Sequence, residues 1–90
     1  MNTIDRLKRV LSMTEVEGVK ILINEIGNKE EKIVNLKETV KEYGVTRSVV
    51  NYSIRFLEVV GIIESRSLGM KGTYIKILDK EMFNSLSELF

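Results

Sequence analysis

The pattern of hydrophobic and polar positions predicts two helices in the first third of the chain. The first covers residues 4–11 and spaces its hydrophobic residues three and four positions apart, at Ile4, Leu7 and Leu11. Overlapping S/T-x-x-E patterns, which are typical of a helix N-terminus, start at Ser12 and Thr14 and place the beginning of the second helix there. Gly27-Asn28 ends this helix, whose buried stripe comprises Val16, Val19, Leu22, Ile23 and Ile26.

The middle of the chain predicts a minor strand and then two helices joined by a tight turn. The strand is Ile33-Val34, and the residue after it, Asn35, can cap a helix that stops at Gly44. Thr46 should cap the next helix, which runs from Arg47 to about Val60. Apolar residues of these two helices recur at helical spacing: Leu36, Val40 and Tyr43 in one, and Val50, Ile54 and Leu57 in the other.

The last third predicts a β hairpin followed by a helix. Two runs, 62–66 and 73–77, alternate apolar and polar residues around a tip that contains Gly69 and Gly72. Asp79 should cap the final helix, which carries Met82, Phe83, Leu86, Leu89 and Phe90 along one side. The expected fold is therefore mainly α with a small antiparallel β hairpin, a winged helix-turn-helix with about five helices and two to three short strands.

Length and composition narrow the functional classes. Ninety residues make one domain, and the absence of Cys and His excludes disulfides, the usual zinc sites and His- or Cys-based nucleophiles. The carboxylates are scattered, so no catalytic constellation is predicted and we expect no enzyme. No apolar run approaches the roughly 20 residues needed to span a bilayer, and we expect a cytoplasmic protein without membrane contact.

The distribution of charge favours a polyanion-binding surface. The net charge is only +1, but residues 44–76 hold five basic residues against two acidic ones, and residues 14–43 hold five against seven. The basic excess thus coincides with the second helix of the turn and the hairpin, as a local phosphate-binding surface requires.

The helix from 47 to 60 is the candidate for insertion into the major groove of DNA. Its exposed candidates, counting its N-cap, are Thr46, Arg47, Ser48, Asn51, Tyr52 and Arg55. Arg can bond guanine through two hydrogen bonds, and Asn can do the same to adenine. The free N–H groups of the first turn also favour a phosphate. The alternative is an ordinary helical hairpin with a solvated polar face.

The hairpin tip, residues 65–73, is the candidate wing. Arg66 and Lys71, with the hydroxyls of Ser65, Ser67 and Thr73, are donors that suit the DNA backbone or minor groove. The alternative is a solvent-exposed hairpin whose charges only maintain solubility. A rival function is a protein-interaction or dimerisation module without DNA binding, carried by Phe56, Val59 and Val60. These three residues could instead pack under the first or last helix.

The motifs GVTRSVV and GIIESRSLGMKGTYIKIL resemble the C-terminal DNA-binding domain of the CodY family of transcriptional pleiotropic repressors. The run from Ser65 to Lys76 matches the family pattern without a change, and weaker similarity extends from about Leu11 to Leu89. The chain departs from the family at Asn51-Tyr52, where Val-Asn is expected, at Phe56, where Lys is expected, and at Val59-Val60, where small residues are expected. Thr39 stands where an aliphatic residue is usual.

The resemblance implies operator binding as a homodimer at AT-rich, roughly palindromic double-stranded DNA, and repression by blocking polymerase. It maps the family's helix-turn-helix onto residues 36–55. It also implies that residues 1–11 are the end of a linker helix and residues 12–90 the winged helix-turn-helix domain. Branched-chain amino acids and GTP, the family's effectors, are implied to bind a separate sensor domain, so no cofactor is expected on this chain.

Overall fold

A computed structural model describes residues 13–90, with side chains from residue 16 onward. Four α-helices and three strands follow one another in the described range: α2 (Met13–Ile26), β1 (Glu31–Val34), α3 (Leu36–Tyr43), α4 (Arg47–Val59), β2 (Ile63–Ser67), β3 (Thr73–Ile77) and α5 (Lys80–Leu89). A 3-10 turn, η1 (Gly69–Lys71), separates β2 from β3. This confirms the predicted winged helix-turn-helix, with four α-helices in residues 13–90 where about five were expected over the whole chain. The helix expected over 4–11, read as the end of a linker helix, lies outside the described residues.

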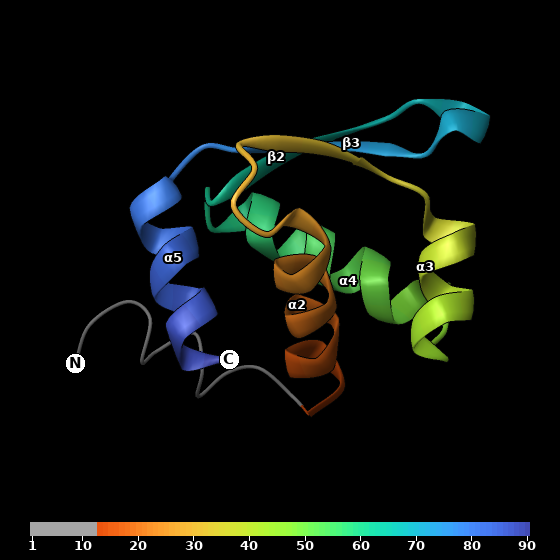
Figure 1. Ribbon diagram of the computed structural model, residues 1–90, viewed down its shortest axis with the longest axis horizontal. Coiled ribbons are helices and arrows are strands. Elements are labelled where there is room, and N and C mark those ends of the chain that lie inside the picture. The colour runs from red at the N-terminus through yellow and green to blue at the C-terminus, as the bar shows by residue number, and fades with distance from the viewer. Residues whose placement is uncertain (1–12) are drawn as a thin grey trace.

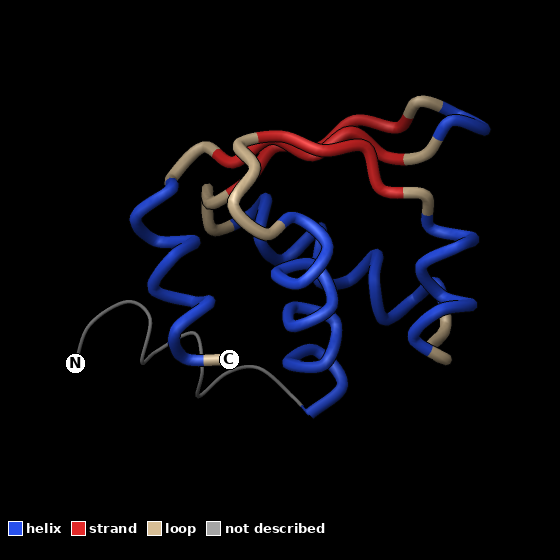
Figure 2. Tube along the Cα trace, viewed as in Figure 1, coloured by secondary structure: helices blue, strands red, loops and turns tan. Residues whose placement is uncertain are grey.

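The three strands form one antiparallel sheet in the order β1-β3-β2. The minor strand predicted at Ile33-Val34 is confirmed as part of β1, and it pairs with β3 through Ile33↔Tyr74 and Val34↔Thr73. Figures 1 and 2 show the helices gathered on one side of the sheet, while the hairpin tip projects past α3. The sheet thus holds the tip beside the N-terminal ends of α3 and α4.

Local hydrogen bonds set the helix boundaries, largely where the sequence predicts them. The Asn35 Oδ1 atom accepts from the Glu38 N–H at 3.1 Å, and the Asp79 Oδ1 atom accepts from the Met82 N–H at 2.9 Å. Gly44 ends α3 in the left-handed conformation with φ 66°. Thr46 occupies the N-cap position of α4, but its side chain makes no capping hydrogen bond, so the expected Thr46 cap is wrong in that respect.

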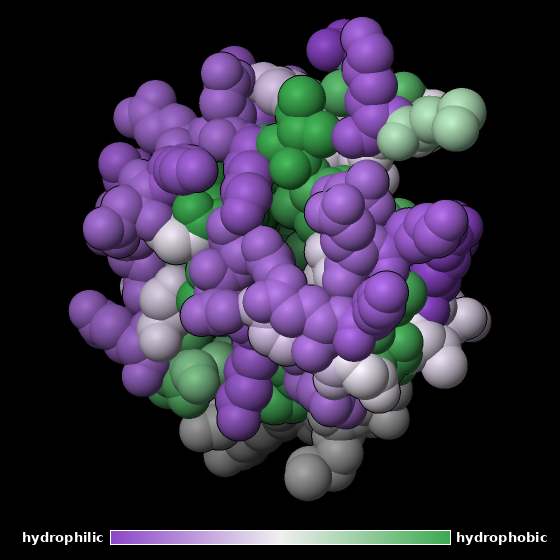
Figure 3. Space-filling view, turned by 45° about the vertical axis from the view of Figure 1, so that its right-hand side comes forward, coloured by the Kyte–Doolittle hydropathy of each residue, from purple (hydrophilic) through white to green (hydrophobic). Residues whose placement is uncertain are grey.

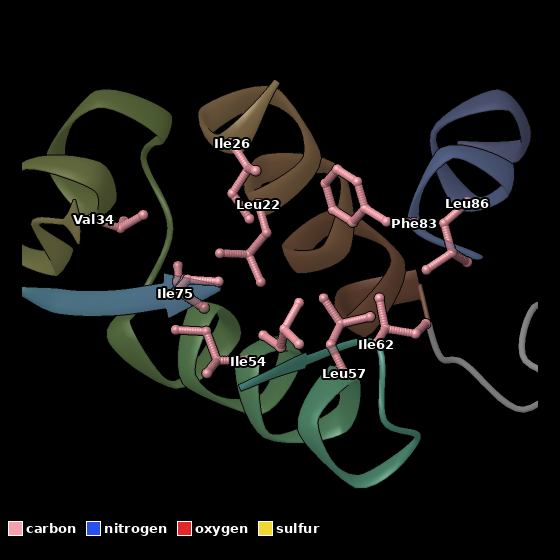
Figure 4. Packing of buried hydrophobic residues seen from close by; sticks show 11 residues of the cluster. Leu22, Ile26, Val34, Ile54, Leu57, Ile62, Ile75, Phe83 and Leu86 are labelled. Atoms are coloured by element: carbon pink, nitrogen blue, oxygen red, sulfur yellow. The ribbon is translucent and has the colours of Figure 1, made fainter. Parts of the chain in front are cut away.

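The core lies between the sheet and the helices, with Leu22 and Ile26 of α2 facing Ile75 of β3 (Figure 4). Phe83 and Leu86 of α5 close the other end against Leu57 and Ile62. The stripe predicted for α2 is buried or half-buried, and Ile21 is buried as well.

The sequence left two possibilities for the apolar residues on the outer side of α4, which were packing against the core or forming an exposed interaction surface. Two of the three pack against the core. Phe56 and Val60 are half-buried and pack against the core cluster. Val59 remains 80% exposed. Thr39 is buried, and its hydroxyl donates to the Asn35 carbonyl at 2.8 Å, which satisfies a polar group at a position where the resemblance led us to expect an aliphatic residue.

Helices α2 and α4 cross at Gly18, which is buried. A Cβ atom there would lie 2.0 Å from the Ser53 Oγ and 2.6 Å from the Val49 carbonyl oxygen. Ser53 is itself fully buried, and its hydroxyl donates to the Val49 carbonyl. Two small residues therefore let the backbones approach closely, and this crossing fixes the position of α4 against the core.

Candidate nucleic-acid interface

The outward side of α4 carries a continuous polar surface. Ser48, Asn51, Tyr52 and Arg55 are all exposed and outline a shallow hollow of about 200 Å³. The Tyr52 side chain is 63% exposed, so its ring is available for contact. Neither Arg47 nor Arg55 forms an ion pair with any residue in the described part of the chain. This surface can offer guanidinium, amide and hydroxyl groups to a partner.

The N-terminus of α4 keeps its polar groups available. Arg47 is the first residue of the helix, and the first turn contains no acidic residue. The Thr46 hydroxyl is exposed and is not used as a cap. Together with the positive end of the helix dipole, these side chains favour a negatively charged ligand.

The hairpin tip has a defined shape. The Leu68 N–H donates to the Gly72 carbonyl at 2.8 Å, and the Gly72 N–H donates to the Gly69 carbonyl at 3.2 Å, closing the η1 turn. Gly72 has φ 118°, and a Cβ atom there would lie 2.6 Å from the Val34 carbonyl oxygen. The tip is therefore seated on the junction between β1 and α3. Met70, fully exposed, and Lys71 project from it.

The five wing candidates do not share one surface. Arg66 lies on the sheet face away from the helices, with its guanidinium carbon 5.4 Å from the centre of the Tyr74 ring. The Tyr74 hydroxyl donates to the Glu31 carboxylate, and this hydrogen bond raises the pKa of Tyr74. Ser67 and Thr73 pair across the strands and line a groove on the opposite side. Ser65 is half-buried beside Arg66, and Lys71 stands at the tip.

A groove of about 330 Å³ lies between the hairpin and the starts of α3 and α4. Its lining comprises Asn35, Leu36, Lys37, Arg47, Ser67, Gly69, Met70, Gly72 and Thr73. In Figure 3, which brings this side of the molecule forward, a notch separates the projecting tip from the hydrophilic surface below it. The groove brings Arg47 together with Ser67 and Thr73, which the sequence placed in two separate segments.

Lys37 is a groove residue that the sequence pattern did not single out. It is exposed at the second position of α3 and lines the groove with Arg47. A signal was present in the sequence, because a lysine in the first turn of a helix opposes the helix dipole and is therefore unexpected on grounds of stability. Nothing in the sequence, however, showed that it would lie beside the hairpin.

Other site classes find no support in the described residues. None of the helices in residues 13–90 has the length and apolarity to cross a membrane. Over the same residues, Asp and Glu side chains form no group of three or more that could hold a metal ion.

Comparison with known proteins agrees with the geometry. The model of the CodY helix-turn-helix domain matches residues 37–89. The chain is 44% identical over 79 residues to the global transcriptional regulator CodY of Lysinibacillus sphaericus, and 46% identical over 79 residues to those of Clostridium kluyveri and an Exiguobacterium species. Each match covers 88% of this chain but only 30% of the relative. The residues matched by the family model comprise α4, the hairpin, α5 and all of α3 but its first residue, and the chain accordingly belongs to the CodY helix-turn-helix domain family.

Proposed function

We propose that this chain is the DNA-binding domain of a CodY-like transcriptional regulator and recognises a specific duplex sequence. The observation that carries the proposal is the exposed surface of α4, formed by Arg47, Ser48, Asn51, Tyr52 and Arg55 beside the groove under the hairpin. Its two arginines make no ion pair with another described residue. A helix of this kind can enter the major groove and present its N-terminal residues to base edges.

The side chains divide into two roles. On α4, Arg47, Asn51 and Arg55 carry the groups that distinguish base pairs, and the Tyr52 ring can contact a thymine methyl group. Thr46, Ser48 and the wing residues Ser65, Ser67, Lys71 and Thr73 supply hydroxyl and ammonium donors for phosphates. Arg66, whose guanidinium lies over the Tyr74 ring, would approach the duplex from the outer side of the sheet.

The proposed biological role follows from the family. Occupying an AT-rich palindromic operator as a homodimer would block polymerase and repress transcription in the cytoplasm. Within such a regulator, residues 12–90 would form the operator-binding unit, and branched-chain amino acids and GTP would act on a separate sensor domain. The chain spans about a third of the length of the curated relatives it matches, so these properties belong to the proposal.

The rival function is a protein-interaction module, and most of the residues expected to form its surface are not fully exposed. It depends on Phe56, Val59 and Val60, but Phe56 and Val60 pack against the core and only Val59 is strongly exposed. A single exposed valine is ordinary for a soluble domain.

Selection of binding sites from random duplex DNA, followed by mobility shifts on the selected duplex, tests the proposal. Arg47→Ala should cost about 1–3 kcal/mol of binding free energy and relax the preference at one base pair, because it removes a base contact. Lys29→Ala is a charge-matched control, since Lys29 is exposed in the turn before β1, at the opposite end of that strand from α3. Failure to enrich any sequence, with non-specific affinity at most, would overturn sequence-specific recognition.

A further inference from the structure

Two basic side chains line the groove under the hairpin, and no acidic side chain lines it with them. These two side chains are Lys37 and Arg47. Neither cation forms an ion pair with another described residue; the two ion pairs found in that part of the chain are Lys32–Glu25 and Lys80–Glu30. The remaining polar side chains of the hairpin wall are the hydroxyls of Ser67 and Thr73. The groove is therefore complementary to a negatively charged ligand.

The helix dipole of α3 gives no reason for a lysine at position 37. It lies in the first turn, where the helix dipole disfavours a positive charge, and its side chain is solvent-exposed. The acidic residue of the same turn, Glu38, carries the negative charge that the dipole favours, and its N–H is capped by Asn35. The ammonium group of Lys37 is thus free to bind a partner in the groove.

The position of the groove indicates which part of DNA that partner is. One wall is the start of α4, which is the element proposed to enter the major groove. The other wall is the hairpin, whose exposed tip residues Met70 and Lys71 would face the adjacent minor groove once α4 lies in the major groove. The major and minor grooves of a duplex are separated by a single sugar-phosphate strand, which carries one negative charge every 3.4 Å of helix axis. With both elements engaged, that strand has to run between them.

We infer that the groove seats the phosphodiester strand that separates the two DNA grooves, and that Lys37 is the residue that neutralises a phosphate there. The inference rests on the proposed function and adds to it a contact from outside α4 and the wing. A lysine on a flexible stem suits a phosphate as a point charge, whereas the neighbouring Arg47 can also make a planar, two-bond contact with a base. Lys37 is accordingly a positioning residue that sets the register of α4 without reading sequence.

The salt dependence of binding tests the inference. Removing one lysine–phosphate interaction should reduce the magnitude of the slope of log affinity against log salt by about 0.9. Lys37→Ala should show this reduction on both the selected duplex and an unrelated one, with an unchanged base preference. The matched control is Lys41→Ala, which removes an exposed lysine one turn further along α3 that does not line the groove, and it should keep the wild-type slope. Circular dichroism and urea unfolding verify that both variants are folded.

A second measurement locates the phosphate. Neutral methylphosphonate linkages are placed one at a time along the selected duplex. At one linkage the wild-type protein should lose affinity while Lys37→Ala loses nothing further, because the same charge interaction has already been removed.

Each contrary result has a distinct meaning. If the wild-type protein binds the selected duplex but Lys37→Ala keeps the wild-type slope, or if Lys41→Ala flattens it equally, the assignment of the groove is wrong and the proposed function stands. If every methylphosphonate weakens both proteins alike, Lys37 is not the phosphate ligand. If the wild-type protein binds no duplex DNA, the proposed function and the inference are both overturned.

Discussion

At the scale of single residues, Gly18 controls where α4 lies. Its missing side chain allows the backbone of α2 to approach the Val49 carbonyl and the Ser53 hydroxyl of α4. In a helix interior, glycine costs about 0.5–1 kcal/mol relative to alanine, so a replacement would be favourable if space existed. The close crossing outweighs that propensity, because a Cβ atom would lie 2.6 Å from a backbone carbonyl oxygen, which cannot rotate away.

Gly18→Ala should therefore destabilise the domain by about 1–3 kcal/mol despite its better helix propensity, because it overpacks the crossing of two helices. Urea unfolding followed by circular dichroism measures the change. Lys20→Ala, at an exposed position of the same helix, should alter the free energy of unfolding by less than about 0.5 kcal/mol. A stabilised Gly18→Ala variant would mean that α2 and α4 can move apart enough to admit the added methyl group without loss of packing.

At the scale of elements, the wing acts as a rigid attachment rather than a loose loop. Its tip is closed by the η1 turn and is seated through Gly72 against the end of β1. Gly72, with φ 118° and ψ −157°, lies in a region of backbone conformation that is essentially restricted to glycine. The same contact forms one wall of the groove that contains Lys37 and Arg47, so the shape of the groove depends on it.

Two glycine substitutions distinguish the effect of the contact between the wing and β1 from the effect of the backbone conformation in the turn. Gly72→Ala introduces both backbone strain and a clash with Val34, and it should cost about 1–3 kcal/mol of stability and weaken DNA binding by displacing the tip. Gly69→Ala, with φ 64° and no atom within 4 Å of the added Cβ, introduces only the strain of the left-handed conformation, about 1–2 kcal/mol. Urea unfolding and mobility shifts compare the variants. Equal losses of DNA affinity would show that the contact with Val34 does not position the wing.

At the scale of the whole molecule, the described surface offers no concentrated apolar patch for self-association. The exposed large hydrophobic residues are distributed over β1, α4, the hairpin tip, the end of β3 and α5: Ile33, Tyr52, Val59, Met70, Leu78 and Leu89. Isolated exposed residues of this kind are normal, whereas a stable dimer requires a larger continuous surface.

We therefore expect this chain by itself to be monomeric at micromolar concentration and to bind DNA weakly. Analytical ultracentrifugation measures the first property. Mobility shifts measure the second. On a duplex with two half-sites about 10–10.5 base pairs apart, two copies should bind without cooperativity. A tight dimer in the ultracentrifuge would contradict this expectation and would assign Val59 and the exposed side of α5 to an interface.

The sequence by itself determined the local structure of this protein. The caps at Asn35 and Asp79, the stop at Gly44 and the inward positions of α4 all follow from bonds and spacings within three or four residues, so the chain states them directly. The exposed candidates on α4 could be predicted for the same reason. Where one local rule failed, at Thr46, the residue holds the cap position without the capping bond.

Only the tertiary structure decided which of these elements meet. It packs Gly18 against Ser53, seats Gly72 on Val34 and places Lys37 beside Arg47. It also separates Arg66, which stacks on Tyr74, from the Ser67 and Thr73 hydroxyls that line the groove. The Gly18–Ser53 and Gly72–Val34 contacts join residues more than thirty positions apart. The geometry of all these neighbours depends on sheet order, strand register and the crossing of helices. No local periodicity encodes those quantities, because each arises only when the separate elements pack around one core.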